Sequence, residues 1–241
     1  MKTLSIASIA VAVAALSAVA VPSITLAADS SVAFNAGVVT DYRYRGLSQS
    51  RLQPALQGGV DFTAGSFYLG AWGSTIKWIK DAPYNGGANV EIDLYGGYKG
   101  EISKGVTYDI GALAYQYPSN KLKPSANTFE VYGAITAGPV TAKYSRSTTN
   151  LFGFANSKGS GYLDLSATFD VGGFAVTPHI GRQTVKNTGA SSYTDYSLAI
   201  SKEVSGITWS ATLVDTNISV IGGAGKDMGK AGIVLGAKMA F

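Results

Sequence analysis

Three features of the sequence predict an all-β fold, a twelve-stranded antiparallel transmembrane β-barrel of the outer-membrane type. An apolar leader opens the chain, apolar and polar residues alternate along twelve later segments, and the chain ends on an aromatic residue, Phe241. Alternation with a period of two places the two kinds of side chain on opposite faces of a strand. Each segment is close to the roughly 9–11 residues that a tilted strand needs to cross a bilayer.

The leader has the features of a secretory signal peptide. Lys2 supplies a positive charge, residues 4–21 are almost all apolar or small, and the small-residue site at 25–27 (Thr-Leu-Ala) follows. We predict cleavage after Ala27, which assigns 1–27 to the signal peptide and 28–241 to one barrel domain. A helical membrane anchor is the alternative. It is disfavoured because a cleavage site follows the apolar run at once and no basic stop-transfer cluster does.

Composition excludes several other classes of protein. The chain has 30 glycines, 14 tyrosines and no cysteine, so disulfides cannot hold an exported domain together. The formal net charge of +4 is too weak to indicate a nucleic-acid partner. No apolar run after the leader is long enough for a spanning helix. We expect no cofactor and no resident metal.

The first four strands are predicted at 32–45, 52–63, 66–77 and 90–100. In the first, Phe34 and Val38 face one side, whereas Asp41, Arg43 and Arg45 face the other. The second and fourth alternate in the same way. The third is the least regular, because tryptophans disturb its pattern.

The remaining eight strands repeat the scheme. They are predicted at 105–117, 128–137, 139–147, 161–171, 173–183, 193–203, 207–215 and 230–241. In the last strand, Ile233, Leu235, Met239 and Phe241 are predicted to face lipid and Lys238 the lumen. We expect this strand to close the barrel against the first, and Leu235, Met239 and Phe241 to form the signal that the barrel-assembly machinery reads.

The links between strands alternate in length. Short turns alternate with longer loops at 78–89, 118–127, 148–160, 184–192 and 216–229. Short periplasmic turns and long external loops are typical of outer-membrane barrels, so both termini are predicted to be periplasmic. Aromatic residues near strand ends are predicted to form girdles at the two membrane surfaces: Tyr42, Tyr44, Tyr68, Tyr98, Tyr108, Tyr144 and Trp209. These residues and Phe241 disfavour a soluble sandwich or lipocalin-like barrel, which buries its apolar face inside.

Several segments resemble a known family. They are 39–50 (Val-Thr-Asp-Tyr-Arg-Tyr-Arg-Gly-Leu-Ser-Gln-Ser), 54–61, 70–74, 91–98 and 115–118. Together they resemble the first half of the TorF-type porins, a proteobacterial family also labelled Gcw_chp. The resemblance implies a porin in the outer membrane of a Gram-negative bacterium, with no established substrate.

Charged residues on the predicted inner face are the candidate pore-lining and selectivity residues. They are Arg43, Arg45, Arg51, Asp61, Glu91 and Asp93. Charged side chains in a pore select ions by their sign. The alternative is a structural network in which the acids neutralise the arginines, because buried charges must be paired.

Two other constellations carry weaker predictions. Glu91, Asp93 and Asp109 project inward from neighbouring strands, but no geometry in the sequence brings their oxygens to one cation, so salt bridges or a hydrated wall are preferred. His179, the single histidine, raises the possibility of a lipid hydrolase. No serine lies near it in the sequence and it alternates inward, so we predict that the protein is not an enzyme.

The external loops leave two questions open. The apolar run Leu151-Phe152-Gly153-Phe154 either folds into the lumen as a constriction or extends a strand. Loop lysines either contact lipopolysaccharide phosphates and steer anions or form an ordinary solvated surface; they are Lys77, Lys80, Lys121, Lys123, Lys158, Lys186 and Lys226.

The predicted function is passive diffusion of small hydrophilic solutes or ions. A filled interior is typical of eight strands and an open channel of 16–18, so twelve predict a narrow or loop-constricted pore. The competing function is a structural or adhesive barrel with a plugged lumen. The expected partners are outer-membrane lipid, lipopolysaccharide, the assembly machinery and the solute.

Overall fold

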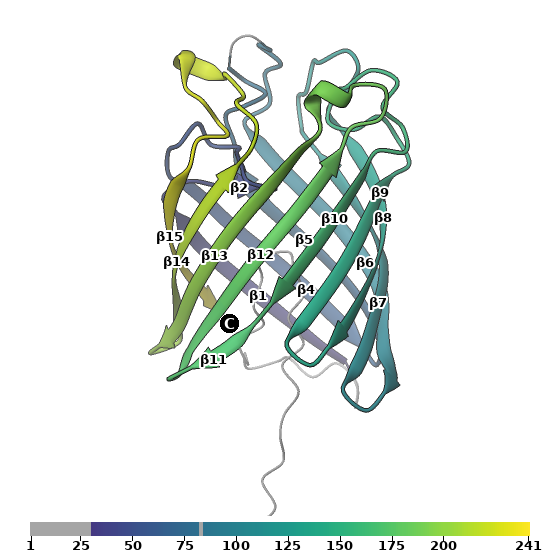
Figure 1. The fold of residues 1–241 in the computed structure, drawn as a ribbon, viewed down its shortest axis with the longest axis vertical. Helices are drawn as coiled ribbons and strands as arrows, with labels where there is room; N and C mark the ends of the chain where they lie inside the picture. Colours follow the sequence, from purple (N-terminus) through teal and green to yellow (C-terminus); the bar gives the residue numbers. More distant parts are fainter. Residues whose placement is uncertain (1–29, 82–83) are drawn as a thin grey trace, which may run out of the picture.

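The alternating segments form the wall of a closed antiparallel barrel (Figure 1). The computed structural model describes residues 30–81 and 84–241. Its wall strands are β1 (Ser30–Val39), β4 (Ala55–Ala64), β5 (Phe67–Thr75), β6 (Val90–Ser103), β7 (Val106–Gln116), β8 (Thr128–Ala137), β9 (Val140–Ser147), β10 (Gly161–Ala167), β11 (Phe169–Val171), β12 (Phe174–Thr184), β13 (Tyr193–Val204), β14 (Ile207–Thr216) and β15 (Gly232–Ala240). Strands β10 and β11 form one wall position interrupted at Thr168, so the wall has the twelve predicted positions.

The ends of the wall meet as predicted. Strand β15 pairs with β1, from Asn35 opposite Ala240 to Val39 opposite Gly236. Phe34 and Phe241 exchange backbone hydrogen bonds of 2.8 and 2.9 Å, and their rings stack at 6.2 Å. Closure leaves no unpaired sheet edge, which a strand in lipid cannot tolerate.

The exterior of the wall is apolar. Leu56 is 66% exposed, Leu69 62% and Ile233 65%, and other large apolar side chains of every wall strand share this face. Such a continuous exposed apolar surface is incompatible with a soluble barrel and matches the lipid-facing band of a membrane barrel. The predicted fold class, including its membrane environment, is confirmed. Among the described residues, no helix has the length and hydropathy to cross a membrane.

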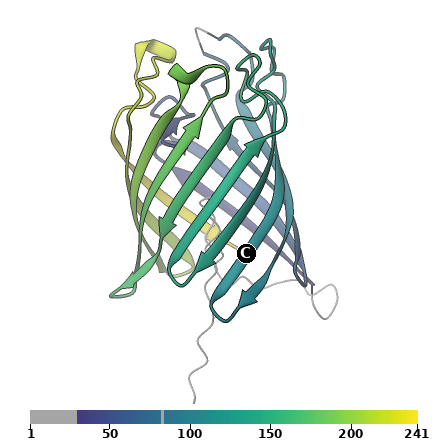
Figure 2. The same ribbon diagram turned by 45° about the vertical axis from the view of Figure 1, so that its right-hand side comes forward.

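The two rims of the barrel differ. Short turns occupy one rim, where the described chain also begins and ends, and the long loops gather at the opposite rim (Figures 1 and 2). We call these the turn rim and the loop rim. Two short 3-10 helices, η1 (Gly189–Ser191) and η2 (Gly223–Gly225), lie in the loops. The predicted signal peptide at 1–27 lies outside the described residues.

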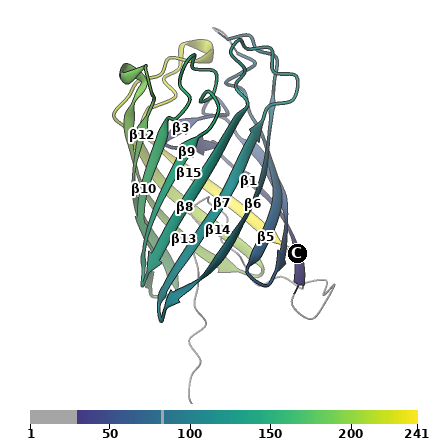
Figure 3. The same cartoon turned by 90° about the vertical axis from the view of Figure 1, so that its right-hand side faces the viewer.

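The first predicted strand is wrong at its far end. Strand β1 stops at Val39, and residues 40–54, called here the lumenal loop, leave the wall and fold into the barrel. The loop contains its own hairpin, β2 (Arg43–Tyr44) and β3 (Leu47–Ser48). Figures 1 and 3 place this hairpin inside the barrel, in the half nearer the loop rim. Arg45 adopts a left-handed φ of 46°, which a continuous strand does not allow.

The predicted aromatic girdles are partly wrong for the same reason. Tyr144 and Trp209 are exposed on the outer face, and Tyr98 and Tyr108 lie together with ring centroids 6.1 Å apart. Tyr42 and Tyr44 belong instead to the lumenal loop, and Tyr68 points inward and donates a hydrogen bond to Asp109 at 2.6 Å. The third strand also ends early, because Ile76 turns inward and is 2% exposed.

Candidate functional site in the barrel lumen

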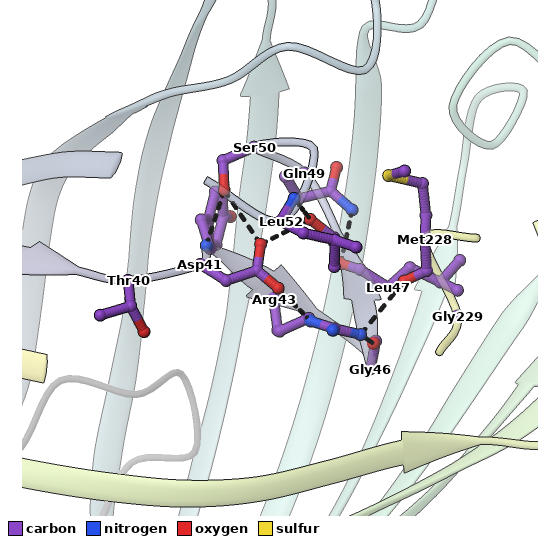
Figure 4. Close-up of polar contacts among 12 residues, drawn as sticks. Thr40, Asp41, Arg43, Gly46, Leu47, Gln49, Ser50, Leu52, Met228 and Gly229 are labelled. Atoms are coloured by element: carbon purple, nitrogen blue, oxygen red, sulfur yellow. Dashed lines mark hydrogen bonds and ion pairs between the residues drawn. The ribbon is translucent and has the colours of Figure 1, made fainter. Parts of the chain in front are cut away.

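The lumenal loop is organised around the buried carboxylate of Asp41 (Figure 4). Asp41 Oδ1 accepts a hydrogen bond from Ser48 Oγ at 2.5 Å and lies 3.0 Å from Ser50 Oγ. Asp41 Oδ2 accepts one from Arg43 Nε at 2.5 Å. A buried carboxylate is stable only when its oxygens are paired in this way. The acid therefore fixes the fold of the loop rather than lining an open pore.

Arg43 ties the loop to the last external loop. Its Nη1 donates to Gly46 O at 2.9 Å and to Met228 O at 3.1 Å. The same Met228 carbonyl accepts a bond from Ser48 N at 2.9 Å. The prediction that Arg43 projects from the inner face of a wall strand is wrong, because its guanidinium is turned back into its own loop.

Arg45 extends across the lumen to the opposite wall. Its Nη2 donates to Glu130 Oε2 on β8 at 2.7 Å, and its Nη1 donates to Gln183 Oε1 on β12 at 2.6 Å. The guanidinium carbon lies 4.8 Å from the ring centre of Tyr44 and 4.2 Å from that of Tyr162 on β10. The loop that leaves β1 thus reaches three strands far from it in the sheet.

The tip of the loop is pressed against the wall at Gly46. A Cβ at this position would lie 2.4 Å from Thr216 Cγ2 and 2.7 Å from Asp195 Cβ, and the φ is +79°. Only glycine fits both the backbone conformation and the space. The tip of the loop therefore packs against β13 and β14.

Apolar side chains fill the lumen around the loop. Tyr42 packs edge-on against Trp72 at 5.5 Å, and Tyr44 does the same against Phe152 at 5.5 Å. Leu151 is 2% exposed and Ile79 is completely buried. Leu151 and Phe152 therefore face the inside, as the constriction interpretation predicts, whereas Phe154 at the end of the run is exposed.

Glu91 and Asp93 face this filled half of the lumen from β6. Tyr42 Oη donates to Glu91 Oε1 at 3.0 Å. Glu91 Oε2 and Asp93 Oδ1 are buried and accept no hydrogen bond from the described residues. Asp109 lies farther along the wall, near Tyr68, and the described part of the chain contains no group of three or more metal-ligating residues.

The other two candidate residues are Arg51, at the end of the lumenal loop, and Asp61, on β4. Arg51 forms a two-pronged ion pair with Asp81 near the loop rim. Asp61 accepts a hydrogen bond from Tyr95 at 2.5 Å on the inner wall. The six candidates therefore do not form one ring. Arg43, Arg45 and Arg51 belong to the lumenal loop, Glu91 and Asp93 face it from β6, and Asp61 lies on the wall strand β4.

The half of the lumen nearer the turn rim is lined by polar and aromatic side chains. Lys143 Nζ lies 3.9 Å from the ring centre of Tyr132. Two strands along the same wall, on β12, His179 Nε2 lies 2.8 Å from Asp164 Oδ2 and 3.2 Å from Tyr162 Oη. Ser166 and Ser197 are the register neighbours of His179, but neither hydroxyl is hydrogen-bonded to its imidazole. The arrangement provides the histidine with acids and a tyrosine rather than with a nucleophile.

Three functional residues escaped the sequence-based prediction. They are the wall residues that contact the Arg45 guanidinium: Glu130, Gln183 and Tyr162. All three alternate toward the lumen within their predicted strands, so their inward direction was available from the sequence. Their common partner was not, because that arginine was assigned to a strand.

The fold and site together define the class. A closed twelve-position barrel with an apolar exterior and a polar, loop-narrowed interior is a porin-type barrel, and its exterior gives it an outer-membrane location. The chain belongs to the Gcw_chp family, described as bacterial protein of unknown function, whose model matches residues 25–241. A search of curated proteins gives no significant match.

Two solved structures are similar in fold. One is titled "KdgM porin in complex with disordered oligogalacturonate", with a TM-score of 0.55, 8% identity, and coverage of 88% of this chain and 99% of that chain. The other is described as a NanC porin structure, with a TM-score of 0.54, 11% identity, and coverage of 87% and 98%. At these identities the likeness is one of fold.

Proposed function

We propose that the protein is a porin-like channel of the TorF type that passes small hydrophilic solutes or ions, with the lumenal loop as its constriction. Both termini would then face the periplasm, and the loop rim would face the outside of the cell. The observation that carries the proposal is the bridge from Arg45 to Glu130 and Gln183, called here the crosspiece. It places charged and polar groups across the lumen, next to the half that polar and aromatic side chains line.

The charges around the crosspiece suggest how it selects. Arg45 is balanced by Glu130, while Glu91 and Asp93 add acidic groups on the side of β6. Arg43 and Arg51 are paired within the loop and its anchor. We infer that selectivity depends on Arg45, Glu130, Glu91 and Asp93, and that Arg43 and Arg51 act by holding the loop.

A plugged barrel is the second candidate. It is favoured by the apolar cluster around the loop, in which Tyr42, Ile76 and Ile79 are buried. In this case the lumenal loop would be a stopper and the protein would serve a structural or adhesive role.

Replacing the lumenal loop distinguishes the two candidates. The wall register between β1 and β4 ends with Val39 opposite Ala55, so an Asn-Gly pair can replace residues 40–54 as a two-residue hairpin turn. Purified wild-type and loop-replaced barrels are compared in planar bilayers. A constriction predicts ohmic current in the wild type and a larger current in the variant. A stopper predicts current only in the variant, and silence of both refutes the channel.

Assembly of the barrel is part of the same proposal. Leu235 and Met239 lie on the outward face of β15, the strand that closes the wall, and the exposed Phe241 follows its last residue. We propose that the barrel-assembly machinery reads this face. Phe241→Ser should lower insertion into the outer membrane, whereas the inward Lys238→Ser should not.

A further inference from the structure

A basic hollow lies on the outside of the barrel at the loop rim. It is bordered by the ends of β9 and β12 and by the loop 148–160, and it has a volume of about 640 Å³. Three cationic side chains line it: Arg146, Lys158 and Lys186. None of the three takes part in an ion pair with a described residue.

The cationic side chains converge over Gly159. A Cβ built on this glycine would lie 3.5 Å from Arg146 Nη2 and 3.7 Å from Lys186 Cδ. The two side chains come from different hairpins, so their convergence is a property of the fold rather than of one charged segment. Like charges brought together without a partner repel each other, and an anion between them removes that repulsion.

Backbone hydrogen bonds hold the hollow in shape. Gly159 N donates to Ser147 O at 2.9 Å, and Ser147 N donates to Ser160 O at 2.9 Å. Lys186 N donates to Ser160 Oγ at 3.0 Å. Asn187 Nδ2 donates to Asn156 O at 2.8 Å and joins the two loops. These bonds fix the backbone that carries the three cations. Such preorganisation lowers the entropic cost of binding a ligand.

The surrounding sequence contains no acid that would neutralise the hollow. Residues 140–163 and 183–194 include neither aspartate nor glutamate. By contrast, Lys77 and Lys226 lie on loops that also carry Asp81 and Asp227. The three cations of the hollow thus lie on segments that supply no acid to neutralise them.

The height of the hollow on the barrel indicates the occupant. Tyr144, two residues before Arg146 on the same outward face, is 50% exposed, and Leu163 opposite it is also exposed. At about 3.4 Å per residue, Arg146 lies roughly 7 Å beyond the tyrosine along the strand. Tyrosines mark the headgroup level of the membrane, so the hollow lies beside lipid headgroups rather than over the lumen.

We propose that Arg146, Lys158 and Lys186 form a binding site for the phosphorylated headgroup of an outer-leaflet glycolipid, the phosphate-bearing part of lipopolysaccharide. The inference rests on the proposed orientation, in which the loop rim faces the outer leaflet. Arginine and lysine supply charge-assisted hydrogen bonds to phosphate oxygens.

Native mass spectrometry of the full barrel in detergent tests the site. The probes are bisphosphorylated lipid A, the same glycolipid without its phosphates, and inorganic phosphate. Arg146→Gln/Lys186→Gln is compared with Lys121→Gln/Lys226→Gln, which removes the same charge from exposed positions on other loops. Heat-shifted gel mobility shows that each variant is folded.

The expected result is binding of phosphorylated lipid A that the first pair weakens about tenfold or more and the control pair leaves unchanged. Equal weakening by both pairs, or equal binding of the dephosphorylated lipid, overturns the proposal. Full displacement by inorganic phosphate also overturns it, because the site would then take a soluble anion. Bilayer conductance of the same variants is recorded separately: lipid binding without current refutes only the channel, and current without lipid binding refutes only this site.

Discussion

Arg45 and Glu130, 85 residues apart in the chain, are joined by a 2.7 Å ion pair inside the barrel. The arginine belongs to the lumenal loop, which follows β1. The acid lies on β8, which is far from β1 in the sheet. Both side chains are almost fully buried. The pair completes the crosspiece, and we expect its removal to affect both stability and conduction.

Arg45→Ala should shift the channel toward cations. Glu130 loses its partner while Glu91 and Asp93 stay in place, so the constriction becomes more acidic. Breaking a buried ion pair from one side typically costs about 3–5 kcal/mol, so the melting temperature should fall as well. Reversal potentials in a salt gradient measure the shift, and Arg182→Ala, an exposed outward arginine, is the control. An unchanged reversal potential would contradict the role given to Arg45.

Gly46→Ala should loosen the loop from the wall. The new methyl group meets Thr216 and Asp195 at less than 3 Å, whereas Gly65→Ala on a turn has a similar left-handed φ of 57° and open space. Both variants pay about 1–2 kcal/mol of backbone strain, but only the first adds a clash. Single-channel recordings should show larger or more frequent openings for Gly46→Ala alone. Equal behaviour of the two variants would show that the clash is harmless.

Phe152→Ala should weaken the packing that holds the loop on its apolar side. Phe152 makes edge-on contacts with Tyr44 at 5.5 Å and with Tyr115 at 5.1 Å, and each such pair contributes about 0.5–1.5 kcal/mol. Phe154→Ala removes a partly exposed ring from the same loop and serves as the control. Protease sensitivity of residues 40–54 should increase only for Phe152→Ala. Increased cleavage in both variants would point to general loosening of loop 148–160.

Lowering the pH should destabilise the last external loop, residues 216–229, by protonating Asp227. Burial acts to raise the pKa of Asp227, but hydrogen bonds from Ser219 Oγ, Val220 N and Gly229 N stabilise its carboxylate. The net effect holds the pKa of Asp227 below its ordinary value. A lowered folded-state pKa means that the stabilisation is present above the unfolded value of about 3.9 and is lost as the pH falls through the folded value.

Hydrogen exchange of residues 216–229 measures this release. At pH 6, Asp227→Asn should exchange faster than the wild type, and the difference should shrink as the pH falls below about 4. Asp170→Asn on the opposite rim is the control, because its carboxylate caps a turn through Gly173 N. A difference that persists unchanged at low pH would exclude titration of Asp227 as the cause.

Much of the wall could be predicted from the sequence because lipid leaves a strict pattern. Strand β8 matches its predicted bounds, 128–137, and Lys238 and Met239 take the predicted opposite faces. Every second side chain in such a strand faces lipid and must be apolar, so a short stretch of sequence is enough to show the pattern. Residues 42–45 (Tyr-Arg-Tyr-Arg) show the same alternation, so the pattern predicts a wall strand there as well.

The site was less predictable because its partners are distant. The local sequence pattern is the same for a strand that continues along the wall and for a loop that enters the lumen with alternating side chains. The distinction depends on whether Asp41 finds Ser48 and Arg43, and whether Arg45 finds Glu130 and Gln183. The contacts of Arg45 form only when distant strands come together, so no period in the sequence reports them.

The bond from Arg43 to the carbonyl of Met228 joins the first loop of the barrel to the last one. A chain that inserts from either end has one of these partners absent until the final hairpin arrives. This bond can form only after the last loop lies beside the first, so we expect the lumenal loop to gain this anchor when β15 meets β1. Closure of the wall and the final anchoring of the loop inside it would then be one event.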